Sequence, residues 1–358
     1  MHHSLISRPF VAAMLAGTLV LGACGNDSSD SSADSTMAAD STIAPSTVEP
    51  VDAAVTTTSP AAETTMTMPS RPQPGGSGTA APAATHANLP YATTSAAQVL
   101  DLWIPAEATA ATPLVIYIHG GAFMGGDKGM VGGKVQPLLD AGFAVASVNY
   151  RLSGEALFPA GVQDVKAAVR WLRANAATYN VDPERFAAWG ESAGGHLAAI
   201  IGTSGDQATL LDDPSLGNAD VSSAVQAVVD WFGPTDFLQM DVQAASGGGC
   251  TAPQVHDPAD SPESAWVGGA LQTVPDVVAQ ANPITYIVTA EDLPAFSVAH
   301  GDADCNVPFQ QSQILADALT AAGATIELTI LPGAAHADAQ FDGTLLTPTI
   351  AWLEATFA

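Results

Sequence analysis

The sequence has few basic residues and few cysteines. Its 358 residues include nine Lys and Arg against 36 Asp and Glu, which gives a formal net charge of −27. So few cations could not replace the counterions around a phosphate backbone, which argues against nucleic acid as a partner. Three cysteines are too few for a disulfide scaffold and lack the Cys-x-x-Cys spacing of a zinc site. Apolar residues make up 47% of the chain, so it is not a wholly disordered acidic polymer.

The first segment has the layout of an export signal. Arg8 precedes an apolar run over residues 11–23 that is too short to cross a bilayer of about 30 Å as a helix. The letters LGAC at 21–24 resemble the lipobox of bacterial lipoproteins, in which the cysteine becomes the lipidated N-terminus. We therefore expect a signal peptide over 1–23, lipidation of Cys24, and an exported chain anchored to the outer face of a bacterial cell membrane. An ordinary secretory peptide with a chance cysteine is the alternative.

Residues 24–85 lack the side chains that a folded core requires. Ser, Thr, Ala and Pro dominate this segment, and it contains no Phe, Trp or Tyr. Such a composition cannot bury enough apolar area to offset the conformational entropy of the chain. We therefore predict a disordered tether, whose roughly 60 residues would have a root-mean-square reach of about 45 Å.

After Tyr91, strand signals alternate with helix signals. This alternation predicts right-handed crossovers and a mostly parallel central sheet with helices on both faces. The length would allow two domains of about 150 residues, but the unbroken alternation predicts one α/β domain over 86–358. We expect strands at 113–118, 143–149, 185–190, 225–232, 294–300 and 325–331, and helices at 132–141, 161–177, 193–202, 308–322 and 347–357.

The most informative motif follows the strand signal at 185–190. Residues 190–194 read Gly-Glu-Ser-Ala-Gly, which is a G-x-S-x-G pattern between an expected strand and an expected helix. Small flanking residues allow a turn sharp enough to expose the Ser192 hydroxyl at the carboxyl edge of the sheet, where active sites form. Ser192 is therefore the candidate nucleophile. A tight helix start without chemistry is the alternative.

A second loop of small residues follows the expected strand at 113–118. It reads HGGAF over 119–123, and its glycines would let backbone N–H groups approach a developing negative charge. Gly121 to Gly126 has Walker-A spacing, but Asp127 stands at the lysine position and no Ser or Thr follows. We therefore do not expect a phosphate loop. A plain glycine turn remains the alternative.

A candidate acid follows the expected strand at 294–300. The turn after this strand contains Asp302 and Asp304, and a carboxylate at a strand end could orient a histidine. The alternative is a solvated acidic turn.

A candidate base is found by elimination among the eight histidines. A Ser…Asp…His order requires the base to follow the acid, and His336 is the only histidine after Asp304. His196 lies on the helix behind the nucleophile and is expected to be structural, because the helix carries it away from the hydroxyl. His300 is expected to shape its loop, and His256 lies in a polar insertion without a partner motif.

Together these motifs resemble those of α/β-hydrolases of the lipase and esterase type with an HGGG-like oxyanion loop, over essentially all of 86–358. Within that group the sequence is most similar to bacterial carboxylesterases of the acetyl-xylan and feruloyl esterase kind. The resemblance implies an α/β-hydrolase fold and no metal or organic cofactor. The stretches that carry it are 114–121, VNYRL at 148–152, FPA at 158–160, DVKAA at 164–168, WFGPTD at 231–236, HGDAD at 300–304 and VP at 307–308.

The resemblance also assigns a catalytic triad. The nucleophile falls on Ser192, the base on His336, and the acid on Asp304, four residues after His300. Asp302 is the rival acid. The implied activity is that of a serine carboxylesterase that forms an acyl-enzyme, with acetylated or feruloylated carbohydrate as an expected substrate.

The same resemblance implies an oxyanion hole. Its donors would be the backbone N–H groups of Gly121, Ala122 and Ala193. Ala122 departs from the third glycine that many relatives carry. A backbone N–H survives that change, although the conformational freedom at the position is smaller.

About 60 residues between two expected strands, 233–293, form an insertion. Such a segment is expected to cover part of the substrate pocket. Cys250 lies in this insertion and Cys305 lies next to the candidate acid. In an exported chain we expect these two cysteines to form a disulfide that pins the insertion to the acid loop. Two unpaired cysteines are the alternative.

Two other functions remain open from the sequence. The acid loop also resembles that of serine peptidases on this fold, although a propeller or other large gating domain does not fit in 358 residues. The domain could also be a surface binding protein with a degenerate hydrolase fold, although such proteins usually lack a catalytic residue. The expected partners are an ester of a small molecule or carbohydrate and, through the lipid anchor, a bilayer.

Overall fold

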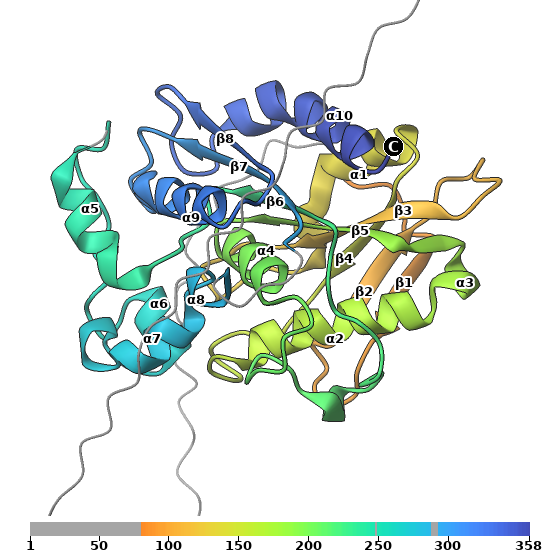
Figure 1. Cartoon of the computed structure of the whole chain (residues 1–358), viewed down its shortest axis with the longest axis horizontal. Coiled ribbons are helices and arrows are strands. Elements are labelled where there is room, and N and C mark those ends of the chain that lie inside the picture. Colours follow the sequence, from red (N-terminus) through yellow and green to blue (C-terminus); the bar gives the residue numbers. More distant parts are fainter. Residues whose placement is uncertain (1–79, 248, 288–292) are drawn as a thin grey trace, which may run out of the picture. The chain divides into compact units, whose positions relative to one another are not determined.

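A mostly parallel sheet forms the centre of the domain (Figure 1). The computed structural model of the chain describes residues 80–247, 249–287 and 293–358. The strand order is β1-β2-β4-β3-β5-β6-β7-β8; β1 pairs antiparallel with β2, β2 pairs antiparallel with β4, and all further pairs are parallel. The predicted fold class is confirmed. The strands are β1 His86–Pro90, β2 Val99–Trp103, β3 Thr112–Ile118, β4 Ala144–Val148, β5 Val181–Glu191, β6 Ala227–Trp231, β7 Ala295–Gly301 and β8 Ile326–Leu331.

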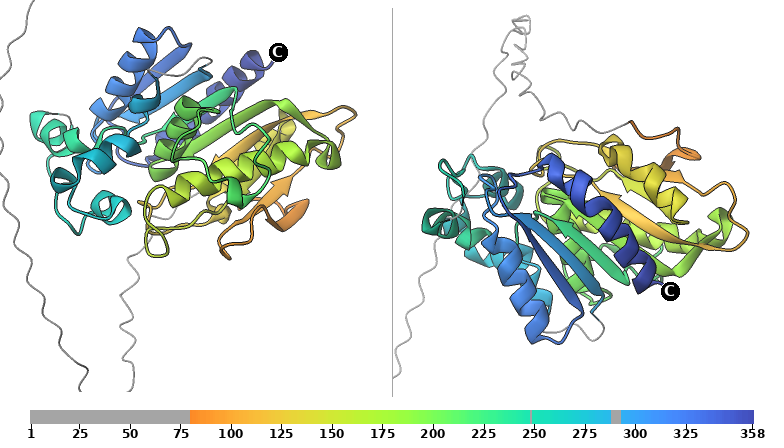
Figure 2. Two further views of the ribbon diagram at one scale, coloured as in Figure 1. Left: turned by 60° about the horizontal axis from the view of Figure 1, so that its bottom comes forward. Right: turned by 90° about the horizontal axis from the view of Figure 1, so that it is seen from above.

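Helices cover both faces of the sheet, as Figure 2 shows. The helices α1 and α10 lie on one face, and α2, α4 and α9 lie on the other. All five helices predicted outside the insertion are present. Their bounds are α1 Val135–Asp140 after the 3-10 turn η1 Lys128–Lys134, α2 Ala160–Ala174 followed by α3 Ala176–Tyr179, α4 Ala193–Ser204, α9 Gln310–Ala321, and α10 Leu346–Thr356 after the π-helical turn η5 Phe341–Leu345.

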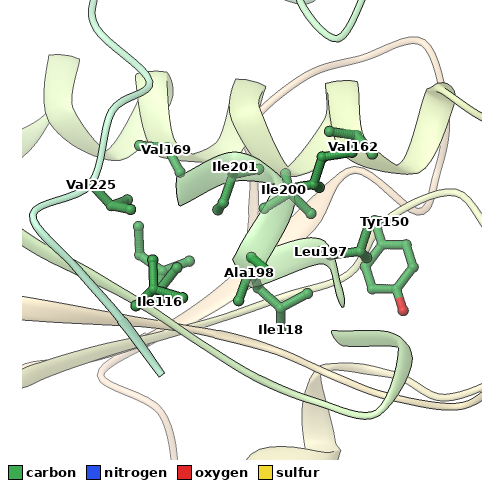
Figure 3. Packing of buried hydrophobic residues seen from close by; sticks show 14 of the residues in the cluster. Ile116, Ile118, Tyr150, Val162, Val169, Leu197, Ala198, Ile200, Ile201 and Val225 are labelled. Atoms are coloured by element: carbon green, nitrogen blue, oxygen red, sulfur yellow. The ribbon is translucent and has the colours of Figure 1, made fainter. Parts of the chain in front are cut away.

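Each face of the sheet has its own hydrophobic core. In β3, Ile116 and Ile118 face the cluster formed with α2 and α4, while Val115 and Tyr117 face the cluster formed with α1 and α10. Figure 3 shows the first cluster, in which side chains of α2 and α4 pack over those two isoleucines. Because successive strand residues alternate between two buried faces, the strand reads as one continuous apolar run.

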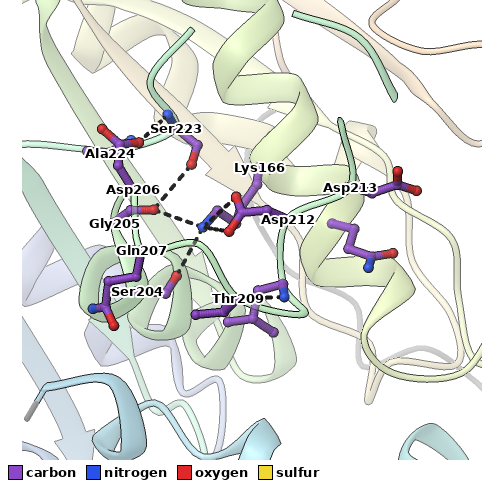
Figure 4. A network of polar contacts seen from close by, with 12 residues as sticks. Lys166, Ser204, Gly205, Asp206, Gln207, Thr209, Asp212, Asp213, Ser223 and Ala224 are labelled. Atoms are coloured by element: carbon purple, nitrogen blue, oxygen red, sulfur yellow. Dashed lines mark hydrogen bonds and ion pairs between the residues drawn. The ribbon is translucent and has the colours of Figure 1, made fainter. Parts of the chain in front are cut away.

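A buried lysine fastens α2 to the loops behind α4 (Figure 4). The Lys166 ammonium is fully buried, donates a hydrogen bond to the carbonyl of Gly205 at 2.8 Å, and lies 2.9 Å from an Asp212 carboxylate oxygen. Burial lowers the pKa of Lys166, and the Asp212 charge opposes that effect. A buried cation needs such partners. The network therefore holds α2 to the loops that follow α4.

The segment between β6 and β7 contains short helices that the sequence did not predict. They are η3 Phe237–Gln239, α5 Met240–Ser246, α6 Pro262–Val267, η4 Leu271–Thr273, α7 Pro275–Ala281 and α8 Ile284–Ile287; a further turn, η2 Pro214–Leu216, precedes β6. These helices gather at one end of the domain in Figure 1. Their lengths of two turns or fewer explain why no helical period was visible in the sequence.

The folded chain begins ahead of the boundary predicted at residue 86. Trp103 donates its indole N–H to the carbonyl of Pro82 at 2.9 Å, and Ile104 N–H donates to the Thr85 hydroxyl at 3.0 Å. Residues 80–85 therefore pack on the domain. The predicted signal peptide, Cys24 and the tether up to residue 79 lie outside the described residues. Within the described ranges, no helix is both long and apolar enough to cross a membrane.

Candidate active site

The predicted site residues lie where parallel strands end together. In the register of the sheet, Ile118 of β3 pairs with Gly190 of β5, and Glu191 pairs with Trp231 of β6. On the other side, Gly301 of β7 pairs with the last residue of β8. The loops that follow these strands therefore start at the same edge of the sheet, which is the usual place for an active site.

Ser192 occupies a sharp turn between β5 and α4. Its backbone has φ 55° and ψ −123°, and its N–H donates to the carbonyl of Trp231 at 2.9 Å. Such a conformation costs a non-glycine residue about 1–3 kcal/mol, so the surroundings must enforce it. A Cβ at Gly190 would collide with the carbonyl oxygen of Gly194, and a Cβ at Gly194 would collide with that of Ile118. The glycines of the motif are therefore required by close backbone packing.

The structure brings Ser192, His336 and Asp304 together. His336 Nε2 lies 2.9 Å from the Ser192 hydroxyl, and His336 Nδ1 lies 2.7 Å from Asp304 Oδ2. Because the carboxylate only accepts, Nδ1 carries the proton, and Nε2 is left to accept the proton of the serine. The imidazole side chain is 15% exposed and the acid side chain is fully buried. This is the geometry of a nucleophile, a base and an orienting acid.

Asp304 sits in a set of donors that keeps it ionised. Its Oδ1 accepts hydrogen bonds from the N–H groups of Asn306 at 2.7 Å and Val307 at 2.9 Å. Burial alone would raise its pKa, but the hydrogen bonds from His300 and His336 hold the pKa of this carboxyl well below its usual range. The rival Asp302 instead accepts from Gly333 N–H at 2.6 Å, so it braces the loop after β8.

His300 is a second partner of the acid. Its Nε2 lies 2.9 Å from the carbonyl of Val307 and 3.2 Å from Asp304 Oδ2, and its Nδ1 lies 2.7 Å from the Ser312 hydroxyl. If the Ser312 hydroxyl donates to Nδ1, the proton of His300 is on Nε2, where it points toward both the Val307 carbonyl oxygen and Asp304 Oδ2. His300 thus shapes the acid loop, as expected, and also contacts the carboxylate directly.

Phe232 is a contact of the base that no motif in the sequence predicted. It follows β6, has φ 46°, and its ring stands edge-on to the His336 imidazole with centroids 4.9 Å apart at 68°. Phe341 in turn packs edge-on against Phe232, with ring centroids 4.5 Å apart. Only the WFGPTD stretch at 231–236 pointed to this region.

The HGGAF loop packs directly on the turn at Ser192. A Cβ at Gly120 would lie 2.7 Å from the carbonyl oxygen of Glu191 and 3.3 Å from Ser192 Cβ, so no larger residue fits there. Among the described residues, the N–H groups of Gly121, Ala122 and Ala193 make no backbone hydrogen bond outside the helices and strands. These are the three donors that the family resemblance implies.

The loop is held in an unusual backbone conformation. Gly121 has φ 114°, Ala122 has φ 56° and Phe123 has φ 59°. The alanine at the third glycine position of the HGGG-like motif therefore adopts a conformation that glycine would adopt without strain. On one side the loop is fixed by His119, whose ring stacks on Tyr150 at 4.4 Å and whose carbonyl accepts the tyrosine hydroxyl at 2.8 Å.

The predicted cysteine pair is present as a disulfide. Cys250 of the insertion is bonded to Cys305 of the acid loop. Two backbone hydrogen bonds run beside it, from Gln254 N–H to the carbonyl of Cys305 and from Gly249 N–H to that of Asp302, both at 2.8 Å. The insertion is therefore attached to the loop that carries Asp304. Elsewhere in the described ranges, no group of three or more His, Cys, Asp or Glu side chains is arranged to hold a metal ion.

Comparison with known proteins assigns the chain to a family. The sequence profile of the BD-FAE family matches residues 100–319, which is more than half of the chain. The chain belongs to the BD-FAE family. It shares 30% identity over 256 residues with esterase LipC of Mycobacterium tuberculosis, covering 71% of this chain and 60% of LipC. With esterase LipQ of the same organism, it shares 30% identity over 260 residues, covering 71% of this chain and 58% of LipQ. The matched region therefore spans about three fifths of these relatives.

Solved structures agree with the family assignment. A truncated carbohydrate esterase from gut microbiota has a TM-score of 0.68 and 34% identity, covering 75% of this chain and 95% of that chain. A bifunctional GH43-CE protein of Bacteroides eggerthii has a TM-score of 0.67 and 35% identity, covering 76% of this chain and 38% of that chain. The fold is thus the α/β-hydrolase fold of esterases.

Proposed function

We propose that the chain is a serine carboxylesterase whose triad is Ser192, His336 and Asp304. The observation that carries the proposal is the continuous hydrogen-bonded relay from the serine hydroxyl through the imidazole to a buried carboxylate. Membership of the BD-FAE family and the esterase names of LipC and LipQ support the same activity.

In the proposed reaction, the Ser192 hydroxyl oxygen attacks the ester carbonyl while its proton passes to His336 Nε2. The protonated imidazole then gives this proton to the departing alcohol, which leaves an acyl group on the serine. Water then enters and gives a proton to the same nitrogen while its oxygen attacks the acyl carbonyl. The bond from the carbonyl carbon to the Ser192 oxygen breaks, the imidazolium returns the proton to that oxygen, and the acid leaves. Asp304 stays ionised throughout and stabilises the imidazolium.

The developing oxyanion would bind to backbone donors on two loops. Gly121 and Ala122 N–H come from the loop after β3, and Ala193 N–H comes from the first residue of α4. The amino end of the helix carries partial positive charge, which favours a negative oxygen at that place. The close packing of Gly120 on Ser192 supports this arrangement, because it keeps the two loops together.

Acetylated or feruloylated carbohydrate is the proposed substrate class. Its support is the similarity to structures described as a carbohydrate esterase and as a GH43-CE protein. The test compares kcat/KM on acetylated xylo-oligosaccharides, methyl ferulate, p-nitrophenyl acetate and p-nitrophenyl butyrate, with a peptide p-nitroanilide added. A preference for simple acyl esters over the carbohydrate esters, or faster cleavage of the anilide, would contradict the substrate class.

Export and lipid anchoring are also proposed. Their support is the n-region, the short apolar run and the LGAC letters at 21–24 in the sequence. In this view Cys24 carries the lipid and places the esterase on the outer face of the cell membrane.

The triad is tested by a set of substitutions assayed on p-nitrophenyl acetate. Ser192→Ala should lower kcat by about 10⁴–10⁶, and Asp304→Asn by about 10⁴, because each breaks the relay. Asp302→Asn should stay within about tenfold of the unchanged protein, since the hydrogen bond that its carboxylate makes within the described part of the chain goes to the loop after β8. Ser246→Ala, at an exposed serine of α5, is the matched control for loss of a hydroxyl. A turnover in Ser192→Ala equal to that of the unchanged protein would contradict the proposal.

A further inference from the structure

Four aromatic rings join the HGGAF loop to the insertion. Phe123 comes from the loop, His196 from the first turn of α4, Phe237 from η3 and Trp266 from α6. We call these four side chains the aromatic clamp. Each is at most 1% exposed. The clamp connects the two segments that would supply the oxyanion donors with the insertion between β6 and β7.

The rings are in direct contact with one another. Phe123 stacks on Trp266 with centroids 4.2 Å apart and an interplanar angle of 12°. His196 stands edge-on to both of these rings, at 5.6 Å and 5.4 Å. Phe237 closes the cluster by stacking on His196 at 4.9 Å. The indole is therefore the side chain that covers the face of Phe123.

His196 contributes to the clamp as an uncharged ring. Burial lowers its pKa to about 4, so the imidazole is neutral at the pH at which esterases are assayed. Its Nδ1 lies 2.8 Å from the carbonyl of Pro234, which the neutral Nδ1–H can reach as a donor. The insertion thus holds the first turn of α4 as well as the HGGAF loop.

Trp266 is itself held by contacts with a further segment of the chain. Its carbonyl accepts the N–H of Phe158 at 2.9 Å, and the Phe158 ring packs edge-on to the indole at 5.1 Å. Ser153 N–H donates to the carbonyl of Phe123, also at 2.9 Å. Both ends of the stack are therefore tied to the segment between β4 and α2.

The backbone next to Phe123 needs this support. Ala122 and Phe123 both have φ near +60°, a region that residues with a Cβ seldom occupy and that persists only where the surroundings enforce it. The peptide between Gly121 and Ala122 carries one of the proposed donors. Any relaxation of Phe123 toward negative φ would turn that N–H away from the Ser192 hydroxyl.

We propose that Trp266 is a positioning residue for ester hydrolysis, which acts through Phe123 to hold the Ala122 N–H toward the developing oxyanion. The inference rests on the proposed function, since it concerns the donors of that reaction. It assigns to the insertion a part in transition-state stabilisation that is separate from covering the substrate.

The experiment compares Trp266→Leu and Trp266→Phe with Trp352→Leu, a matched control on α10 at the other face of the sheet. Activity on p-nitrophenyl acetate is divided by the number of serines labelled to completion with a fluorophosphonate, so unfolded molecules are not counted. Trp266→Leu should lower kcat by about 10–100-fold with KM changed by less than about threefold, because a misplaced donor weakens only the transition state. Trp266→Phe, which keeps a ring to stack on, should recover most of the loss.

A trifluoromethyl ketone provides a readout that a merely structural role would not move. Its hemiketal oxygen occupies the oxyanion position, so its inhibition constant should rise in Trp266→Leu by the same factor as kcat falls. The pH midpoint of kcat/KM should stay unchanged, because the relay of Ser192, His336 and Asp304 is intact. An unchanged inhibition constant, or a rise in KM with kcat retained, would overturn the inference.

A double variant tests whether Trp266 acts through Phe123. If it does, the double variant Phe123→Leu with Trp266→Leu should be no less active than the less active of the two single variants. Additive losses would show that the two side chains act separately and would refute the mechanism. Failure of the proposed function itself looks different: the unchanged protein would then have no more ester hydrolysis than Ser192→Ala.

Discussion

A carboxyl group without a charged partner lies directly behind the candidate nucleophile. Asp230 is fully buried in β6, next to Trp231, whose carbonyl accepts the Ser192 N–H. Its Oδ1 accepts from Gly233 N–H at 3.0 Å, and its Oδ2 has no hydrogen-bond partner among the described residues. Burial, which the Gly233 hydrogen bond opposes, raises the pKa of Asp230 to about 7. The group is therefore protonated in the native protein at mildly acidic pH.

This burial predicts a pH-dependent cost in stability at Asp230. An unfolded Asp has a pKa of about 3.9, so between pH 4 and 7 the native state keeps a proton that the unfolded state has lost, and stability falls as the pH rises through that window. Asp230→Asn cannot ionise and keeps an oxygen to accept from Gly233. Its free energy of unfolding in urea should equal or lie slightly below that of the unchanged protein at pH 4.5 and exceed it by about 2–4 kcal/mol at pH 8. The exposed Asp317→Asn serves as the control, and a difference that is the same at both pH values would contradict the prediction.

Single residues were predictable where a motif ties them to a strand end. Ser192, Asp304 and His336 each stand at a short, fixed distance after a strand, so motif and chain order together located them. Phe232 and Trp266 could not be found in this way. Their partners lie far away in the sequence, and an aromatic residue in an apolar stretch reads only as core.

Among the elements, the central parallel strands and the helices that cover them were predictable because both faces of the sheet are buried. The edge strand β1 and its neighbour β2 were missed. In β1, exposed and half-buried residues mix without an apolar run, since the strand has a partner on one side only. The helices of the insertion were missed as well, because tertiary contacts stabilise them; α6, for example, begins at a Ser261 cap and ends beneath the Phe123 ring.

The disulfide is the covalent link between two elements, the insertion and the acid loop. It joins residues 55 positions apart, and closing a loop of that length should stabilise the fold by about 2–4 kcal/mol. We expect the Cys250→Ser and Cys305→Ser double variant to lose that amount in urea unfolding. Dithiothreitol should lower the unchanged protein to the same value and leave the double variant unaffected. A reductant that does not change the stability of the unchanged protein would contradict this role.

For the whole molecule, the shortage of positive charge bears on the substrate. Residues 86–358 keep 29 of the 36 acids and seven of the nine bases. Six of the seven basic side chains form ion pairs within the domain, so little positive charge is left to attract an anion. An uncharged ester is therefore favoured over a strongly anionic one. The pairs are Lys128 with Asp101, Lys134 with Glu191 and Asp342, Arg151 with Asp164, Lys166 and Arg170 with Asp212, and Arg185 with Asp182.

The same charge makes the proposed membrane attachment testable. A chain with net charge −27 should not adsorb electrostatically to an anionic bilayer, so attachment would depend on the lipid at Cys24. Expressed at full length in a bacterial host, the protein should sediment with membranes, incorporate labelled palmitate, and be released by detergent but not by 1 M salt (an ionic strength with a Debye length of about 3 Å). Cys24→Ser should lose the label and the sedimentation but keep kcat, whereas Ser28→Ala should behave as the unchanged protein. Sedimentation of Cys24→Ser with the membranes would contradict the lipid anchor.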